Sequence, residues 1–319
     1  MAMQMQGEMV VPKTDPLENN PSLGVYFMQD SQEGDGNHEV YFTQFSKRHR
    51  LLVTAGSSSM ANLWDLRSDD YTDFKSCSLP HIRKKGMIEN SAEVSSVHWN
   101  AKGDRILTSS SDKVARVWQV KESGEVEIQR VKDFQDILMN SKFNNCDQGN
   151  LVATSGLFST VYVWDCEPES YREVARFEHA DIDPDFKGLE IEWQNSKSVA
   201  VAGKSRLIHL WNVDQQSKPV VTWKGHEGEV EQIAWDPSGQ LLASCSTDSY
   251  VCIWKPDSSS PKLTLKGQTG SAVSTIKWSN ADAQHNDPLL AAGTTDGQIL
   301  IWNIEQGNLL TKLQAHDKE

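Results

Sequence analysis

The stretch WKGHEGEVEQIAWDPSGQLLASCSTDSYVCIW, residues 223–254, contains short extended segments separated by turns. A β-rich run ends at Trp235, and the residues DPSG follow, whose proline and glycine suit the backbone angles of a tight turn. A second apolar run starts at Leu241, the residues TDS make another turn, and a third run ends at Trp254. This alternation predicts a β-sheet built from consecutive antiparallel strands.

The same unit recurs along the 319-residue chain, and two aromatic positions set its register. The first position ends the opening strand of each unit and is occupied by Phe45, Trp99, Phe143, Trp193, Trp235 and Trp278. The second ends the third strand and is occupied by Trp64, Trp118, Trp164, Trp211, Trp254 and Trp302. All of the eleven tryptophans except Trp223 fall on these two positions, so we expect six repeats of one structural unit.

The unit resembles the WD repeat, which opens on a Gly-His pair such as Gly225-His226, closes on a tryptophan and forms one propeller blade. The resemblance predicts an all-β WD-repeat β-propeller with six recognisable four-stranded blades, and it leaves a seven- or eight-bladed plan open. We assign residues 22–319 to the propeller and the polar, aperiodic residues 1–21 to a disordered tail. The blades are expected near 38–67, 92–120, 136–166, 186–213, 228–255 and 271–304, with a final outer strand at 309–316.

The apolar run LGVYFM at 23–28 bears on whether the ring closes. If this run is an outer strand, the other three strands of its blade are missing, and the chain is a truncated form of a larger propeller. If it is not a strand, six blades close on themselves. We expect six blades with imperfect closure, which would expose strand edges and apolar faces.

Composition narrows the class of partner and the compartment. The formal net charge of −13 argues against binding to nucleic acid or to an anionic membrane, because both need clustered Lys and Arg. The five cysteines are odd in number and show no CxxC spacing, and three of them lie inside predicted strands. This pattern fits a reducing compartment. No apolar run is long enough to span a membrane, and no secretory signal is evident. These features predict a soluble intracellular protein, either cytosolic (cytoplasmic) or nuclear.

Four polar residues of the fifth unit are expected to form a buried structural hydrogen-bond network: His226, Ser244 (or Ser246), Asp248 and Trp254. The second unit keeps only Asp112 and Trp118 of this set. A catalytic His226–Asp248 dyad is the less favoured alternative, because every member belongs to the repeat. No catalytic motif, metal site or cofactor site is predicted, so the chain is not expected to be an enzyme. The basic run HIRKK at 81–85 is interpreted as a solvated loop.

The narrow face of a propeller is formed by the turns into the first strand and out of the second strand of each blade. At these rim positions we predict a partner-binding surface made of Glu39, Tyr41, Glu93, Met139, Lys187, Lys204, Glu229 and Glu231. Its predominantly acidic character favours Lys- or Arg-rich segments, with Tyr41, Met139 and Leu157 as apolar anchors. The alternative is that these carboxylates are simply solvated turn residues.

Over residues 91–119 and 186–254 the chain resembles the transducin β-like (Ebi-type) corepressor subunits of histone deacetylase complexes. That family typically has eight blades and a helical N-terminal segment, and neither is evident here. The resemblance implies a non-catalytic nuclear scaffold whose partners are corepressor and histone deacetylase subunits or basic histone-like segments. The motif WDLR at 64–67 resembles substrate receptors of cullin-type ubiquitin ligases, for which Arg67 would dock the adaptor. A propeller hydrolase is the third alternative.

Overall fold

The computed structural model describes residues 39–46, 49–67, 75–81, 92–144, 150–157, 160–167, 172–179, 188–267, 270–279 and 288–316. These residues form six four-stranded antiparallel sheets, and no helix occurs among them. The predicted all-β architecture of six four-stranded units is therefore confirmed. The predicted tail, the run at 23–28 and Lys187 lie outside the described residues. No helix in the described part of the chain is long and apolar enough to cross a membrane.

Each sheet is one blade, numbered 1 to 6 in chain order. Blade 1 consists of β1 (Val40–Phe45), β2 (Leu51–Gly56), β3 (Met60–Asp65) and β4 (Lys75–Pro80). Blade 2 consists of β5 (Val94–Trp99), β6 (Arg105–Ser110), β7 (Val114–Val120) and β8 (Val126–Asp133). Blade 3 consists of β9 (Leu138–Phe143), β10 (Leu151–Gly156), β11 (Thr160–Asp165) and β12 (Arg172–Glu178).

Blade 4 consists of β13 (Gly188–Trp193), β14 (Ser198–Gly203), β15 (Leu207–Asn212) and β16 (Val221–Lys224). Blade 5 consists of β17 (Val230–Trp235), β18 (Leu242–Ser246), β19 (Tyr250–Trp254) and β20 (Leu263–Lys266). Blade 6 consists of β21 (Val273–Trp278), β22 (Leu289–Thr294), β23 (Gln298–Asn303) and β24 (Asn308–Gln314). The last strand thus starts and ends slightly earlier than the expected 309–316.

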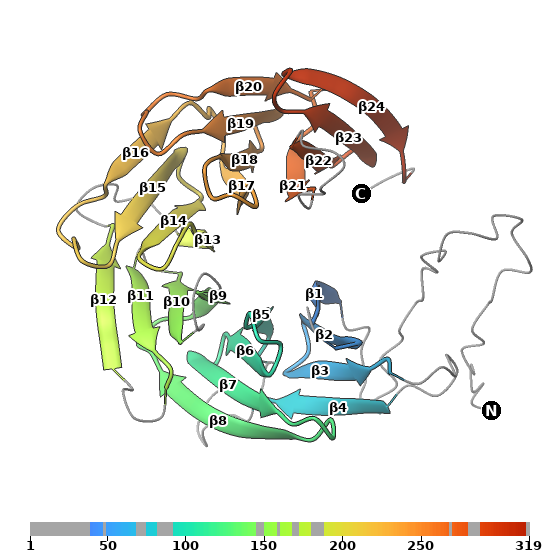
Figure 1. The fold of residues 1–319 in the computed structure, drawn as a ribbon, viewed down its shortest axis with the longest axis vertical. Helices are drawn as coiled ribbons and strands as arrows, with labels where there is room; N and C mark the ends of the chain where they lie inside the picture. The colour runs from blue at the N-terminus through green and yellow to red at the C-terminus, as the bar shows by residue number, and fades with distance from the viewer. Residues whose placement is uncertain are drawn as a thin grey trace, which may run out of the picture.

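The strands of a blade follow one another outward from the centre of the molecule, so β1, β5, β9, β13, β17 and β21 are innermost (Figure 1). The second strands of blades 2 to 5 lie between strands of their own sheet and between two neighbouring blades, and almost all of their residues are buried. Both β2 and β14 are buried at every position. This double burial explains why LLVTAG and SVAVAG are continuous runs of apolar and small residues rather than alternating patterns.

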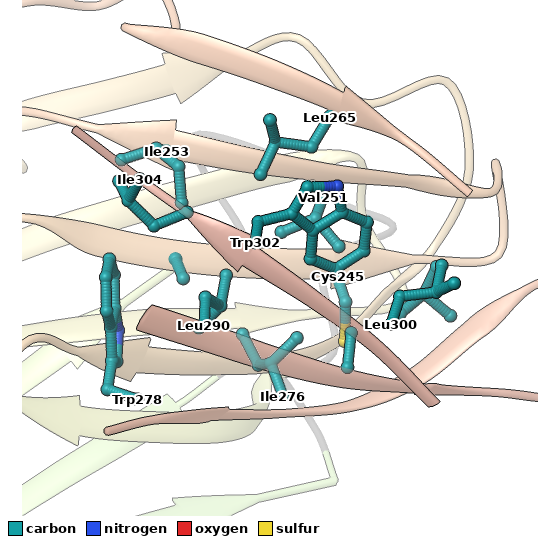
Figure 2. Close-up of a cluster of buried hydrophobic side chains, with 13 residues drawn as sticks. Cys245, Val251, Ile253, Leu265, Ile276, Trp278, Leu290, Leu300, Trp302 and Ile304 are labelled. Atoms are coloured by element: carbon teal, nitrogen blue, oxygen red, sulfur yellow. The ribbon is translucent and has the colours of Figure 1, made fainter. Parts of the chain in front are cut away.

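The hydrophobic core consists of five clusters, and each lies between two consecutive blades. In the cluster of Figure 2, blade 5 contributes residues of β18–β20 and blade 6 contributes residues of β21–β23 and the following Ile304. We name the side of a blade that packs on the following blade its front face, and the opposite side its back face. Every core cluster therefore joins a front face to a back face.

Polar bonds also tie consecutive innermost strands together. The tryptophans that end β5, β13 and β21 donate through Nε1 to a backbone carbonyl of the preceding blade, at 2.9 to 3.1 Å. Side chains of the preceding blade also accept hydrogen bonds from backbone N–H groups of the innermost strand. Gln44 Oε1 accepts from Trp99 N at 2.7 Å, and Gln232 Oε1 accepts from Ile276 N at 2.6 Å. These bonds satisfy backbone groups that no further strand of the same sheet can reach.

The six blades form an open arc, with the opening between blade 1 and blade 6 (Figure 1). Contacts between innermost strands run from β1 to β5, β9, β13, β17 and β21 in turn, and no comparable contact joins β21 to β1. Each blade supplies all four of its own strands, so none is shared between the two ends of the chain.

Candidate functional site

In blade 5, four side chains form one buried hydrogen-bonded chain. His226 Nδ1 lies 2.9 Å from Asp248 Oδ2, and His226 Nε2 lies 2.7 Å from Ser244 Oγ. Because a carboxylate only accepts, Nδ1 carries the proton, and Ser244 donates its hydroxyl hydrogen to Nε2. Trp254 Nε1 then donates to Ser244 Oγ at 2.8 Å. Burial lowers the pKa of His226, so the imidazole is neutral in this network.

Blade 2 contains a second such network. His81 Nε2 lies 2.7 Å from Thr108 Oγ1, which also accepts from Trp118 Nε1 at 2.9 Å. The guanidinium of Arg116 lies between His81 Nδ1 and Asp112, and its Nη1 donates to Asp112 Oδ2 at 2.8 Å. Because a guanidinium cannot accept, His81 Nδ1 is the acceptor and Nε2 carries the proton. Burial lowers the pKa of this imidazole as well.

Two sequence interpretations are therefore wrong. The fifth unit is not alone in holding a complete set, and His81 is buried rather than solvated. The other residues of the basic run, 82–85, lie outside the described residues. The sequence search missed His81 because it lies thirteen residues before β5, whereas His226 lies four residues before β17. The end of the preceding outer strand predicts the position of the histidine better. His81 lies one residue after the end of β4, and His226 lies two residues after the end of β16.

The other blades keep parts of this arrangement. In blade 4, Trp211 Nε1 donates directly to His179 Nε2 at 2.8 Å. In blades 1 and 3 the closing tryptophan donates to a threonine of the second strand at 3.0 Å, from Trp64 to Thr54 and from Trp164 to Thr154. The networks thus hold strands of the repeat together, and every histidine and aspartate in them already has a structural partner.

The rim positions repeat at the same edge of the blades. In five blades, the backbone carbonyl of the residue before the innermost strand accepts from the backbone N–H of the residue after the second strand, at 2.9 to 3.0 Å. The pairs are Glu39–Ser57, Glu93–Ser111, Ile137–Leu157, Glu229–Thr247 and Ala272–Thr295. The residues at these positions are exposed or half-buried, which leaves their side chains accessible to a partner.

One acidic group lies where blade 1 meets blade 2. Glu39, Tyr41 and Glu93 are exposed, and Glu39 N donates to Ser57 Oγ at 2.8 Å. Partial desolvation and the nearby carboxylates of Glu93 and Glu39 raise the pKa of the Tyr41 hydroxyl. Met139 is half-buried on β9 of blade 3, so these two predicted apolar anchors are separated by blade 2.

A second and larger acidic group covers blades 3 to 5. We name it the inner acidic face and define it by Glu190, Glu192, Glu229 and Glu231, together with Lys142 and Lys204. Lys142 Nζ contacts the Glu192 carboxylate and lies 3.8 Å from Glu190 Oε2. Lys204 is close enough to Glu231 to lower the pKa of that carboxyl. Four carboxylates therefore face two ammonium groups.

Burial, reinforced by neighbouring carboxylates, raises the pKa values of two of these carboxyls. Burial raises the pKa of Glu190 to about 7, and the carboxylates of Glu192 and Glu231 add to the rise. Lys142 and the Asn140 amide, which donates to Glu190 Oε1 at 3.3 Å, oppose it. Burial and Glu229 likewise raise the pKa of Glu231. A cationic side chain placed here would stabilise the ionised carboxyls.

Sequence reasoning placed Lys204, Glu229 and Glu231 on the rim, and the structure brings these three close together. It did not single out Glu190, Glu192 or Lys142, which lie on β9 and β13 within the innermost strands. The sequence signal for these residues is the strand GLEIEW, which carries two glutamates, together with a lysine at a matching position of the preceding repeat. That signal needs the blade alignment, because Lys142 and Glu192 occupy the same position in consecutive repeats.

Arg67 joins blade 1 to blade 2. Its guanidinium forms a bidentate pair with Asp65, and Nη1 donates to the Glu122 carbonyl at 2.7 Å. An adaptor that bound Arg67 would have to compete with these bonds.

Among the described residues, no group of three or more His, Cys, Asp or Glu side chains is arranged to hold a metal ion. Cys77, Cys166, Cys245 and Cys252 form no disulfide, and burial raises the pKa of the Cys166 thiol to about 11. The buried thiols therefore serve as small apolar side chains of the core.

Comparison with known proteins agrees with the fold. Residues 84–119, 217–255 and 259–303 match the family model described as WD domain, G-beta repeat. The chain is 27% identical over 285 residues to the F-box-like/WD repeat-containing protein TBL1X of Mus musculus, covering 88% of this chain and 52% of the relative. It is 28% identical over 287 residues to the WD40 repeat-containing protein HOS15 of Arabidopsis thaliana, covering 87% and 45%. The chain thus spans about half the length of these relatives.

The three matched stretches are WD repeats, and the six four-stranded sheets are consistent with the architecture of a WD-repeat propeller. Among such proteins it is homologous to the transducin β-like protein TBL1X and to HOS15. WD40 domains mediate protein–protein interactions, which supports a role as an interaction scaffold.

Glu190 should make stability depend on pH in a way that its amide variant does not. The folded carboxyl has a pKa of about 7 against an ordinary 4.5, so the folded state holds a proton that the unfolded state releases between these values. The contribution of Glu190 to the free energy of unfolding of wild type therefore rises as the pH falls from 7 to 4.5. We therefore expect Glu190→Gln to change the free energy of unfolding, relative to wild type, more favourably at pH 8 than at pH 5. The difference between the two pH values should be about 1 to 3 kcal/mol.

Urea unfolding at the two pH values measures this difference, and Glu125→Gln at an exposed turn is the control. An equal effect of Glu190→Gln on the free energy of unfolding at both pH values would show that the folded structure does not raise the pKa of this carboxyl.

Proposed function

We propose that this WD-repeat protein is a non-catalytic scaffold that binds Lys- and Arg-rich segments of partner proteins on its inner acidic face. The observation that carries the proposal is the excess of carboxylates in that face, where Glu190 and Glu231 have raised pKa values. A bound lysine or arginine would compensate this charge with short, charge-assisted hydrogen bonds. The innermost strands hold these carboxylates in place through their neighbouring blades, so little ordering accompanies binding.

The proposed partners follow from the resemblance to the transducin β-like corepressor subunits. Similarity to TBL1X and HOS15 favours the same assignment, namely membership of a nuclear corepressor complex with histone deacetylase. Histone tails are Lys- and Arg-rich segments of the kind that the inner acidic face would attract. The network histidines and aspartates all have structural partners, which favours the scaffold over a hydrolase.

Charge reversal of the inner acidic face tests the binding mode. We expect Glu229→Lys combined with Glu231→Lys to weaken binding of a fluorescent histone H4 tail peptide about 100-fold, because two attractive charges become repulsive. Fluorescence anisotropy measures the affinity, which should also fall steeply with added salt. The matched control is Glu125→Lys with Glu127→Lys on the exposed end of blade 2, with the same change in net charge. Equal affinities for the two double variants would overturn the proposal.

Complex membership needs a separate measurement. The chain should be purified by affinity from nuclear extract, and the proteins that accompany it should be identified by mass spectrometry. Recovery of a histone deacetylase with a large corepressor, retained by Arg67→Ala, is the expected result. Recovery of a cullin and its adaptor, lost in Arg67→Ala, would replace the corepressor assignment with the ligase alternative.

A further inference from the structure

The loop between β19 and β20 of blade 5 contains a serine that is followed by a proline. Residues 255–262 read KPDSSSPK, and Ser260-Pro261 is the only Ser-Pro or Thr-Pro pair in the 319-residue sequence. Ser260 is exposed, and both strands that flank the loop lie on the outer side of the blade (Figure 1). The hydroxyl of Ser260 is therefore accessible to a modifying enzyme.

Pro261 favours a backbone conformation that such an enzyme can bind. A proline disfavours the α conformation for the residue before it, so the sequence favours an extended Ser260. A Cβ atom added at Gly225 would lie 3.4 Å from Pro261 Cγ and Cδ, so the proline ring lies beside Gly225. An extended serine followed by a proline is the form in which proline-directed protein kinases bind their substrates.

The bonds of this serine to the rest of the loop involve mainly side chains. Ser260 N donates to Ser258 Oγ at 3.3 Å, and Ser258 Oγ donates to Ser260 O at 3.1 Å. One backbone bond reaches the neighbouring blade, from Lys224 N of β16 to Ser259 O at 3.3 Å. The strand β20 begins at Leu263, so no strand pairing within the blade has to break when Ser260 enters the cleft of a kinase.

Lysines from two blades surround the loop. Lys255 and Lys262 flank it within blade 5, and Lys224 ends β16 of blade 4. All three lysines are exposed, and the loop contains one acidic residue, Asp257. A phosphate on Ser260 would therefore have cationic donors on both sides of the junction between the two blades. Phosphate oxygens form short, charge-assisted hydrogen bonds with such donors.

We propose that Ser260 is phosphorylated by a proline-directed protein kinase and that lysines of blades 4 and 5 hold the phosphate. In this step the hydroxyl oxygen forms a bond to the γ-phosphorus of MgATP, while the bond from that phosphorus to the β,γ-bridging oxygen breaks. ADP leaves, and the hydroxyl proton passes to the catalytic aspartate of the kinase and then to solvent. The modification adds a charge of about −1.5 to −2, which links β16 to the loop before β20 through ion pairs.

This site is separate from the inner acidic face. The loop and β16 lie at the outer side of blades 4 and 5, whereas Glu190 and Glu231 lie on the innermost strands β13 and β17 (Figure 1). Phosphorylation of the loop does not require that a basic segment binds to the inner acidic face. The two proposals can therefore fail independently of each other.

Incubation of the full chain with MgATP and a purified mitogen-activated protein kinase tests the first half of the proposal. Tandem mass spectrometry should locate a single added phosphate on Ser260, and Ser260→Ala should abolish it. Pro261→Ala should also lose the phosphate, although its serine is intact. Ser258→Ala is the matched control in the same loop and should be phosphorylated like wild type. The proposal is overturned if Ser260 carries no phosphate, or if Pro261→Ala is modified as fast as wild type.

Phosphorus NMR of the modified chain tests the second half. The second pKa of the phosphate should be lower than in a phosphorylated peptide of residues 255–263, because nearby lysines favour the dianion. Lys224→Gln should raise this pKa, since Lys224 belongs to blade 4. Lys266→Gln, at an exposed lysine at the far end of β20, is the control and should leave the pKa unchanged. Equal pKa values in the folded chain and in the peptide would show that the lysines do not hold the phosphate.

Discussion

Replacing Trp254 with alanine is expected to lower the free energy of unfolding by about 4 kcal/mol. The side chain is 1% exposed and packs between blades 4 and 5, in the cluster that includes Trp223 and Ile233. Its removal opens a large cavity in the interface between two blades and takes away the donor to Ser244 Oγ. Domains are typically stable by only about 5 to 15 kcal/mol, so this loss is a large fraction of the total.

A second substitution separates packing from hydrogen bonding. Trp254→Phe keeps most of the buried ring but has no N–H, while Ser244 retains its bond to His226. We expect this variant to lose about 1 to 2 kcal/mol. Urea denaturation followed by circular dichroism gives both values. If the phenylalanine variant were as unstable as the alanine variant, the hydrogen bond rather than the packing would hold the blade.

Gly56→Val is expected to displace β1 from blade 1 at a cost of about 3 kcal/mol. A Cβ atom at Gly56 would lie 1.8 Å from the Glu39 carbonyl oxygen and 2.9 Å from Val40 Cα. Both are backbone atoms, so a change of rotamer cannot relieve the clash. The displacement would break the backbone bond from Ser57 N to Glu39 O and move Glu39 and Tyr41 away from the rim.

Hydrogen exchange measured by mass spectrometry should show lost protection across β1, with blades 3 to 5 unchanged. Gly270→Ala is the informative control, because Gly270 has φ of +75° but no atom within 4 Å of the added Cβ. That variant should cost only about 1 kcal/mol and leave β1 protected. Undiminished protection of β1 in Gly56→Val would show that the chain relaxes around the new side chain.

The blades could be predicted from sequence because their signals are local and repeat. The two aromatic positions and the turn residues lie within one unit, and each recurs with nearly constant spacing. The blade 5 network was accessible for the same reason, since His226, Ser244 and Asp248 lie within one repeat. His81 was missed because the residues between it and β5 break the usual spacing.

The inner acidic face depends on contacts between repeats, which a search within one repeat does not find. Lys142 and Glu190 are almost fifty residues apart, and their proximity follows from the packing of β9 beside β13. The pKa of Glu190 depends further on burial, which no residue pattern specifies.

The open arc also determines how cooperatively the molecule unfolds. In a linear array, each unit is stabilised by its immediate neighbours, so an internal blade must break two interfaces to unfold and a terminal blade only one. Among the described blades, blades 2 to 5 each pack on two neighbours, whereas blades 1 and 6 each pack on one. Glu190 and Glu231 belong to blades 4 and 5, each of which has a described neighbour on both sides. The carboxylates proposed to bind a partner thus lie in blades whose opening breaks two interfaces, so we expect these blades to open only near the free energy of global unfolding.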